Sequence, residues 1–498
     1  MLHSLLIPPL LLTLAHAPAD NPPAAPREFR AVWVATLDNI DWPSSRTLSP
    51  EKQLAEIRQN LDLAVELKLN AVILQVRAAA DAVYNSSLEP WSLYLTGTQG
   101  QAPNPPWDPL TAWIDEAHRR GIELHAWLNP CRAHIRSTKP ADSHVSRRHP
   151  ELLVQYDKYL WFDPGNPTAV EHILAVFADV TKRYDIDGIH VDDYFYPYPV
   201  LKDGRPLPFP DDDSWNRSKS ADNNLGRDDW RRQNVHQLVR RIHQQTLRIK
   251  PGIRFGISPF GIIRPDPDHG ITGFDQYSGI YADPLVWLSE DWCDYLAPQL
   301  YWPITQKAQS FPLLLKLWHR QNPRNIPIWP GLYTSRLGSG NPLWTPTELL
   351  QQIEICRSHS LPSGHLHFSL ITLRENRRQI ADLLKSTAYQ SPALPPPVRR
   401  PPTAPPPAPA ATLDPGQTHI QLQIADNQQE NSPASEKPRL AAAWFHDGVN
   451  WHFHTQPATS TRIQLPPGTL RTFVFTVDRW GQMSDPVSIM LRQNQNPD

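Results

Sequence analysis

The chain has 498 residues, with 48 Lys and Arg against 50 Asp and Glu, and a formal net charge of −2. The chain has no excess of basic residues with which to bind a polyanion, so we expect no nucleic-acid partner. The length accommodates one large domain and one smaller domain, and the 55 Pro predict linkers and turns between the elements.

An apolar run from Leu5 to Leu14 opens the chain and ends in Ala15-His16-Ala17. The run is too short to span a bilayer, and its A-x-A end is typical of a signal peptidase site. We therefore expect a secretory signal peptide over residues 1–17, a Pro/Ala-rich spacer over 18–27, and no membrane span in the mature chain. The three Cys lie far apart and predict no disulfide framework.

Strand and helix patterns then alternate in chain order from Glu28 to Lys385. The expected strands are 28–37, 71–77, 123–129, 188–194, 254–261, 295–302, 327–334 and 364–370. The expected helices are 49–68, 108–120, 166–184, 227–249, 282–290, 307–319, 345–357 and 374–385. Eight such units predict a (β/α)8 TIM barrel over residues 28–390. A doubly wound sheet is disfavoured, because the turn after the first strand, LDNIDWPS, has no glycine.

Alternation along these strands collects polar side chains on one face, which we expect to be the barrel interior. The opposite parity, with Leu366 and Phe368, is expected to pack against the helices. The expected inward set is Gln75, Arg77, His125, Asn129, His190, Asp192, Tyr194, Ser258, Gln299, Tyr301, His365, His367 and Ser369.

A Pro-rich stretch, SPALPPPVRRPPTAPPPAPA, follows the expected barrel. We expect residues 391–411 to be a semi-rigid linker. Beyond it, six short alternating segments and an Asp447-Gly448 turn predict a small all-β sandwich over 412–498. Such a domain could contact a protein or a glycan.

The stretch DGIHVDDYFYP places two adjacent carboxylic acids where an apolar strand ends. Asp192 shares the inward parity of His190, and the pattern from Gly188 to Asp192 resembles the fourth strand of retaining glycosidase barrels such as the α-amylases. Glycoside hydrolysis needs one carboxylate beside the anomeric carbon and a second carboxyl group of raised pKa as proton donor. We take Asp192 and Asp193 as the catalytic candidates. The identity of the donor stays open among them and Asp81, Glu89, Asp275 and Asp283.

Six stretches resemble the glycosyl hydrolase-like family ten, in order along the chain. They are FRAVWVATLDNIDWPS, HAWLNPCR, FDPGNP, DGIHVDDYFYP, FGISPFGIIR and DYLAPQLYW, and they cover nearly all of Arg30 to Lys385. The resemblance implies an exported bacterial glycosidase, secreted or periplasmic, that acts on a polysaccharide, with cell-wall glycan strands as the substrate class. It also implies a site at the end of strand four. The segment TFVFTVDRWGQMSDP resembles the end of a fibronectin type III domain.

Further strand-end residues are candidates for substrate binding. Amide and hydroxyl groups bind sugar hydroxyls, Arg binds a sugar carboxylate, and aromatic rings stack on sugar faces. Trp127 is a further stacking candidate. The expected substrate-binding set is Trp33, Arg77, Asn129, Arg132, His190, Tyr194, Ser258, Gln299, Tyr301 and Trp302.

Two alternatives remain open at this point. A metal-dependent hydrolase on the same barrel would draw its ligands from His125, His190, His365, His367 and Asp192. A non-catalytic barrel would keep the aromatic residues and bind glycan without turnover. The favoured glycosidase chemistry needs no cofactor and no metal.

Overall fold

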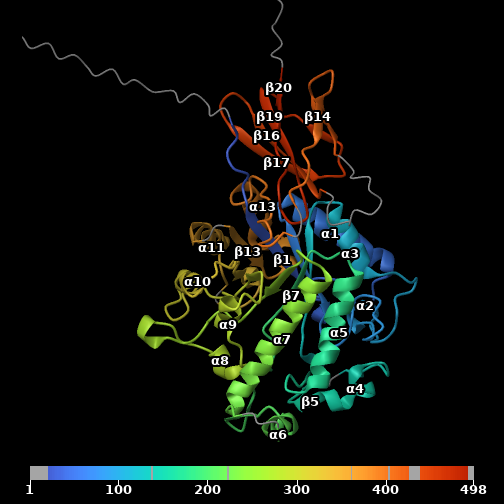
Figure 1. Cartoon of the computed structure of the whole chain (residues 1–498), viewed down its shortest axis with the longest axis vertical. Helices are drawn as coiled ribbons and strands as arrows, with labels where there is room; N and C mark the ends of the chain where they lie inside the picture. The colour runs from blue at the N-terminus through green and yellow to red at the C-terminus, as the bar shows by residue number, and fades with distance from the viewer. Residues whose placement is uncertain are drawn as a thin grey trace, which may run out of the picture.

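The computed structural model describes residues 21–135, 138–220, 224–341, 343–359, 362–401, 404–424 and 438–491. The expected signal peptide at 1–17 lies outside these residues. Figure 1 shows two bodies: a large one built of strands and helices, and a smaller all-β one stacked on its end. Within the described residues, no helix has both the length and the apolar character to cross a bilayer.

Eight parallel strands form the interior of the large body, in the order β11-β10-β7-β3-β2-β1-β13-β12. The ring closes where the Leu296 amide donates to the Pro327 carbonyl and the Trp329 amide donates to the Leu296 carbonyl, both at 2.9 Å. The predicted TIM barrel is therefore confirmed. The strands are β1 (Glu28–Val34), β2 (Ala71–Arg77), β3 (Glu123–Leu128), β7 (Gly188–Val191), β10 (Arg254–Ile257), β11 (Tyr295–Leu296), β12 (Gly331–Leu332) and β13 (Ser363–His367).

Helices cover the barrel, and three of them begin with a side-chain N-cap followed by Pro. Ser49, Asp108 and Asn166 each accept a hydrogen bond from a first-turn amide, and each is followed by Pro. The covering helices are α1 (Pro50–Glu66), α3 (Pro109–His118), α5 (Pro167–Arg183), α7 (Arg227–Ile249), α9 (Pro284–Ser289), α10 (Phe311–Arg320), α11 (Pro346–His359) and α13 (Ile380–Ser386).

Short elements fill the loops between these units. The short helices are α2 (Leu93–Thr96), α4 (Val145–Arg148), α6 (Asp212–Ser220), α8 (Gln276–Gly279) and α12 (Leu370–Arg374). The 3-10 turns are η1 (Leu37–Asn39), η2 (Pro150–Leu152), η3 (Pro267–His269), η4 (Thr334–Leu337) and η5 (Arg377–Gln379). The loop strands are β4 (Arg132–Ile135), β5 (Leu153–Tyr156), β6 (Tyr159–Phe162), β8 (Leu201–Lys202) and β9 (Arg205–Pro206).

The barrel interior is packed by large side chains set against glycines. A Cβ on Gly188 would lie 2.5 Å from the His125 ring, and one on Gly256 would lie 2.0 Å from the Tyr295 ring. A closed barrel of eight strands is just wide enough for side chains to fill, so small residues on one strand make room for rings on the next. The two glycines on β7 and β10 therefore admit the His125 and Tyr295 rings.

The expected orientation of the last strand, β13, was wrong. His365 and His367 both contact the Tyr389 hydroxyl in the helix layer, the latter at 2.8 Å. Leu366 packs in the interior cluster with Trp33 and Trp329, and Phe368 also contacts that cluster. Alternation alone could not choose the face, because the interior accepts Leu and Phe while the polar partner of the two His comes from a distant segment.

The smaller body consists of two antiparallel sheets, β14-β15-β18 and β17-β16-β19-β20. They enclose a core that includes Ile420, Phe445, Ile463 and Val474. This arrangement agrees with the expected sandwich, whereas its likeness to fibronectin type III stays a prediction. The strands are β14 (Ala410–Leu413), β15 (His419–Gln423), β16 (Leu440–His446), β17 (Trp451–Pro457), β18 (Arg462–Gln464), β19 (Arg471–Val477) and β20 (Val487–Met490).

The first part of the expected linker packs against the barrel instead of standing free. The Leu394 side chain is fully buried, and its backbone exchanges hydrogen bonds with Pro26 and Glu28 at 2.9 and 3.1 Å. Asn70 also donates to the Ala393 carbonyl at 3.1 Å. The beginning of the Pro-rich stretch is thus a strap across the end of the barrel at which the strands begin.

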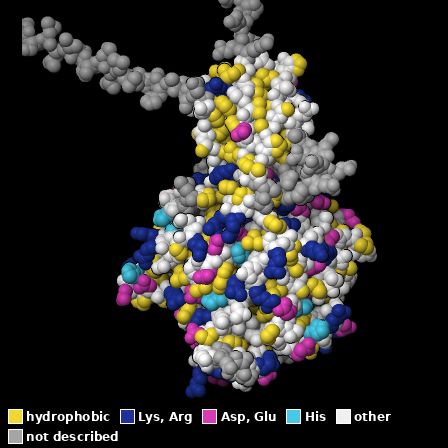
Figure 2. Space-filling model, in the orientation of Figure 1, with side chains coloured by type: hydrophobic (Ala, Val, Ile, Leu, Met, Phe, Trp, Pro, Cys, Tyr) yellow, Lys and Arg dark blue, Asp and Glu magenta, His cyan; other side chains and the backbone are white. Residues whose placement is uncertain are grey.

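The sandwich docks on that same end. Arg479 pairs with Asp185 at 2.6 Å and with Asp187 at 3.1 Å, and Arg439 also reaches Asp187 at 3.1 Å. Asp187 directly precedes β7, so these ion pairs lie at the amino-terminal end of the strands. Figures 1 and 2 show the sandwich as the narrower body seated at one end of the wider barrel.

Candidate active site

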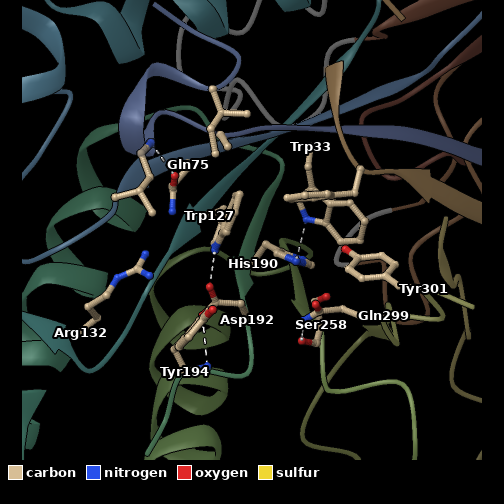
Figure 3. Close-up of a pocket in the computed structure, with 14 residues that line it drawn as sticks. Trp33, Gln75, Trp127, Arg132, His190, Asp192, Tyr194, Ser258, Gln299 and Tyr301 are labelled. Atoms are coloured by element: carbon tan, nitrogen blue, oxygen red, sulfur yellow. Dashed lines mark hydrogen bonds between the residues drawn. The ribbon is translucent and has the colours of Figure 1, made fainter. Parts of the chain in front are cut away.

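A cavity of about 160 Å³ opens where the barrel strands end. Loops at this end carry the active site in essentially every characterised TIM-barrel enzyme. Figure 3 shows side chains from several strands converging on it. Its lining residues are Trp33, Ala35, Leu37, Ile40, Gln75, Trp127, Arg132, His190, Asp192, Tyr194, Ser258, Gln299, Tyr301 and Phe368.

Asp192, the first residue after β7, provides the carboxyl group of this cavity. It is 4% exposed and accepts hydrogen bonds from the Trp127 indole at 3.3 Å, the Tyr194 amide at 3.4 Å and the Asn129 side chain. Burial, and then the neighbouring Asp193 carboxylate, raise the pKa of Asp192 to about 7. The group is held in one orientation and keeps its proton to higher pH than an ordinary Asp.

Asp193 lies beside the cavity and does not line it. Its carboxyl group is 2% exposed and accepts hydrogen bonds from the Tyr198 hydroxyl and the Gln299 side chain. Burial raises the pKa of Asp193 to about 6. Gln299 does line the cavity, so Asp193 lies just behind that part of the wall.

Asn129 positions Asp192 and has no exposed surface of its own. Its amide oxygen accepts from Gln75 at 2.6 Å, and its amide nitrogen donates to Asp192. Gln75 also accepts from the Thr36 and Leu37 amides at 3.1 and 3.0 Å. The expectation that Asn129 binds substrate is therefore corrected: it links the loop after β1 to Asp192.

Arg77 was expected to bind substrate, and the structure gives it another partner. Its guanidinium forms two hydrogen bonds to Glu89, at 2.7 and 2.6 Å, and neither side chain has exposed surface. Burial opposes ionisation of Glu89, yet Arg77 lowers the pKa of that carboxyl to about 2. Strand β2 is irregular between Gln75 and Arg77, which shifts the expected alternation and leaves Arg77 outside the cavity.

His190 forms the floor of the cavity, and its hydrogen bonds go to Trp33 and Tyr295 and not to Asp192. Its Nε2 accepts from the Trp33 indole at 3.2 Å (Figure 3). Its Nδ1 contacts the Tyr295 hydroxyl at 3.0 Å. Acceptance at Nε2 assigns the proton to Nδ1. Burial holds the pKa of His190 well below its usual range. This neutral ring orients Trp33 as part of the cavity wall.

The other expected binding residues fall into two groups. Trp33, Arg132, Tyr194, Ser258, Gln299 and Tyr301 all line the cavity, together with His190. The Arg132 guanidinium lies 5.0 Å from the centre of the Tyr194 ring. Trp302 does not line the cavity: it packs edge-on against Phe260, at 5.6 Å between ring centres.

Phe368 and Gln75 line the cavity although the sequence did not single them out as site residues. Phe368 contacts Trp33 and Tyr301, at 6.0 and 5.7 Å between ring centres. Its role was hidden by the wrong face assigned to β13. Gln75 had the inward parity, and its position one strand from Asn129 was the signal that pointed to it. Trp127, a stacking candidate, also lines the cavity and contacts Asp192.

The other acids considered as proton donors have partners elsewhere. Asp283 pairs with Arg264 at 3.0 Å, and Asp275 accepts from the Tyr277 amide at the start of α8. Asp81 accepts from the Ala79 amide, and Glu89 pairs with Arg77. Over the described residues, no three His, Cys, Asp or Glu side chains gather as metal ligands would. His365 and His367 lie in the helix layer, away from His190.

Comparison with known proteins gives this cavity a context. The family profile described as glycosyl hydrolase-like 10 matches residues 28–344. Glycosyl hydrolase YngK of Bacillus subtilis (strain 168) is 40% identical over 382 residues, which are 74% of this chain and 73% of that protein. Glycosyl hydrolase DigH of Escherichia coli (strain K12) is 34% identical over 328 residues, 60% of this chain and 72% of that protein.

Among solved structures, the PgaB (BpsB) glycoside hydrolase domain from Bordetella bronchiseptica is similar at 15% identity and a TM-score of 0.48, over 72% of this chain and 99% of that domain. The profile match and the two sequence matches are long enough to establish family membership. The chain belongs to the glycosyl hydrolase-like 10 family.

Proposed function

We propose that the protein is an exported glycosidase that cleaves the glycan strands of bacterial peptidoglycan, with Asp192 and Asp193 as its catalytic acids. The observation that carries the proposal is the pair of buried carboxyl groups at the end of β7, one of them facing an aromatic-lined cavity at the barrel mouth. The raised pKa of both groups suits a site that must donate a proton near neutral pH.

The lining of the cavity supports a sugar substrate. Trp33, Tyr301 and Phe368 offer rings on which the apolar face of a sugar packs. A cavity of about 150 Å³ holds one six-membered ring such as benzene. The 160 Å³ found here therefore suits a single sugar residue, while the rest of a strand lies over the loops outside.

Arg132 supports the choice of cell-wall glycan among polysaccharides. Its guanidinium lines the cavity and is close enough to favour ionisation of both Asp192 and Asp193. The lactyl ether of the cell wall's muramic acid carries a carboxylate, which a guanidinium binds well. The apolar run and the A-x-A pattern at residues 5–17 support the proposed export.

Mass spectrometry of digestion products tests the substrate class. The purified protein without residues 1–17 is incubated with peptidoglycan, with peptide-free glycan strands, and with chitin oligosaccharides as carboxylate-free controls. We expect products from the glycan strands, and a larger fall in kcat/KM for Arg132→Gln on the strands than on chitin oligosaccharides. Glycan binding without products from any of the three would favour the non-catalytic alternative.

A further inference from the structure

The number and position of the carboxyl groups at this cavity limit which glycosidase mechanism it can support. Two-carboxylate glycosidases place their acids on both sides of the scissile bond, about 5–5.5 Å apart when they retain and about 6.5–9.5 Å apart when they invert the anomeric configuration. Among the described residues that line the cavity, Asp192 is the sole acid. The other acids of the surrounding loops are held by their own partners, as with Glu89 on Arg77.

The second acid, Asp193, is the next residue in the chain. Asp192 faces the cavity, while Asp193 is held by Tyr198 and Gln299 at its edge. Two consecutive residues at one strand end approach a bound sugar from the same side. They are badly placed to flank the anomeric carbon, with one as nucleophile and the other as proton donor. A nucleophile supplied by the substrate removes this conflict.

We propose that the sugar in the cavity is a β-linked 2-acetamido sugar whose own acetamido oxygen attacks the anomeric carbon, with Asp192 receiving the acetamido N–H and Asp193 protonating the leaving oxygen. This inference rests on the proposed glycosidase function and names the sugar that the site requires. Substrate assistance of this kind is one of the recognised exceptions to the two-carboxylate scheme.

The surroundings of the two acids fit these roles. Asp192 accepts from the Trp127 indole, the Tyr194 amide and Asn129, which fix its orientation, and burial raises its pKa to about 7, so its carboxylate takes up a proton more readily than an ordinary Asp. Such an anion can hold the acetamido group against the anomeric carbon. Asp193 adjoins the cavity through its hydrogen bond with Gln299, which lines the wall, and burial raises its pKa, which suits a proton donor.

The reaction balances without a further reactant except water. The acetamido oxygen forms a bond to the anomeric carbon as the bond from that carbon to the leaving oxygen breaks. The leaving oxygen takes the proton of Asp193, and the acetamido N–H proton passes to Asp192, which leaves a neutral oxazoline. Water then gives a proton to Asp193 and attacks the anomeric carbon, the oxazoline ring opens, and the nitrogen regains its proton from Asp192. The two displacements retain the anomeric configuration.

Chemical editing of the substrate tests the proposal. Peptide-free glycan strands are compared with the same strands after de-N-acetylation, and with those strands after re-acetylation as the matched control. We expect at least about a hundredfold slower cleavage of the de-N-acetylated strands, full recovery on re-acetylation, and first products of retained configuration by ¹H NMR. Equal rates on both strands, or inverted products, leave the glycosidase standing and overturn the inference. No cleavage of any strand contradicts the proposed function itself.

Two variants test the separate roles of the acids. An aryl β-glycoside of an N-acetylglucosamine disaccharide with a 2,4-dinitrophenyl leaving group needs no proton donor, whereas the glycan does. We expect Asp193→Asn to lose activity on glycan but to keep most of its kcat/KM on the aryl glycoside, because kcat/KM there reports the first step alone, and Asp192→Asn to lose kcat/KM on both. The reverse pattern, or loss of both activities in both variants while their melting temperatures are unchanged, contradicts the assigned roles.

Discussion

At the scale of single residues, Asp192 makes the folded protein sensitive to pH. Its pKa is about 7 in the folded chain, against an ordinary value of 3.8. Both states bind its proton below pH 4, so its contribution to stability is complete there. That contribution is lost as the pH rises toward 7, because the unfolded chain releases the proton first and the folded chain resists.

Asp192→Asn removes this dependence. We expect the free energy of unfolding of the variant, relative to wild type, to rise by on the order of 4 kcal/mol between pH 4 and pH 8. Urea unfolding at several pH values measures it. A difference that stays constant over this range would show that the Asp192 carboxyl is not held in a desolvated site.

The buried pair of Arg77 and Glu89 gives a second prediction at this scale. Removing Arg77 leaves the buried Glu89 carboxylate with His172, at 3.2 Å, as its remaining side-chain contact. We expect Arg77→Leu to lower stability by about 3–5 kcal/mol, and Arg77→Leu/Glu89→Leu to recover much of that loss. Denaturant unfolding of both variants provides the comparison. A stable Arg77→Leu protein with a raised KM would instead restore Arg77 as a substrate-binding residue.

At the scale of elements, β7 connects the packed interior to the site. Gly188 begins the strand and leaves room for the His125 ring, and Asp192 follows its end. We expect Gly188→Ala to cost about 1–3 kcal/mol through overpacking and to lower kcat by displacing Asp192. Calorimetry and the glycan assay measure the two effects.

Gly416→Ala is the matched control for that substitution. Its nearest side-chain atoms are 3.9 Å from the added Cβ, and it lies in the sandwich. Its stability should stay within about 0.5 kcal/mol of wild type. If Gly188→Ala behaved like the control, the His125 ring would not be what fixes the start of β7.

The elements also show how far sequence patterns reach. Hydrophobic alternation located the eight strands, and the pair Ser49-Pro50 located the start of the first helix, because both signals are local. The face of β13 was missed, since the partner of His365 and His367 is Tyr389, which lies beyond the strand itself. In the site, parity brought Asp192, Tyr194 and Ser258 together. It failed at Arg77, where strand β2 becomes irregular.

At the scale of the whole molecule, the sandwich and the cavity lie at opposite ends of the barrel. Arg479 and Arg439 hold the sandwich to Asp187, which precedes β7, whereas Asp192 follows it. The described part of the sandwich therefore does not contribute to the cavity. We propose that the sandwich contacts glycan or protein, at the end of the barrel opposite to the cavity.

Arg479→Leu tests this separation. We expect a loss of about 1–3 kcal/mol in stability, since Asp187 keeps Arg439 as a partner, and a kcat/KM on soluble glycan within about twofold of wild type. Arg462→Leu, at a side chain that is 57% exposed, is the control and should change neither. If Arg479→Leu is fully folded and its kcat/KM still falls strongly, the docking of the sandwich must influence the cavity at the other end of the barrel.

The carboxyl pair after β7 is the proposed catalytic centre for glycan cleavage, and rate measurements on its variants test that role. The kcat/KM for peptide-free glycan strands is measured for wild type, for Asp192→Asn, and for Asp213→Asn as an exposed acid in the same loop. We predict measurable cleavage by wild type, a fall of about 10²–10⁴-fold in Asp192→Asn, and no change in Asp213→Asn. Cleavage by Asp192→Asn at the wild-type rate would contradict the account.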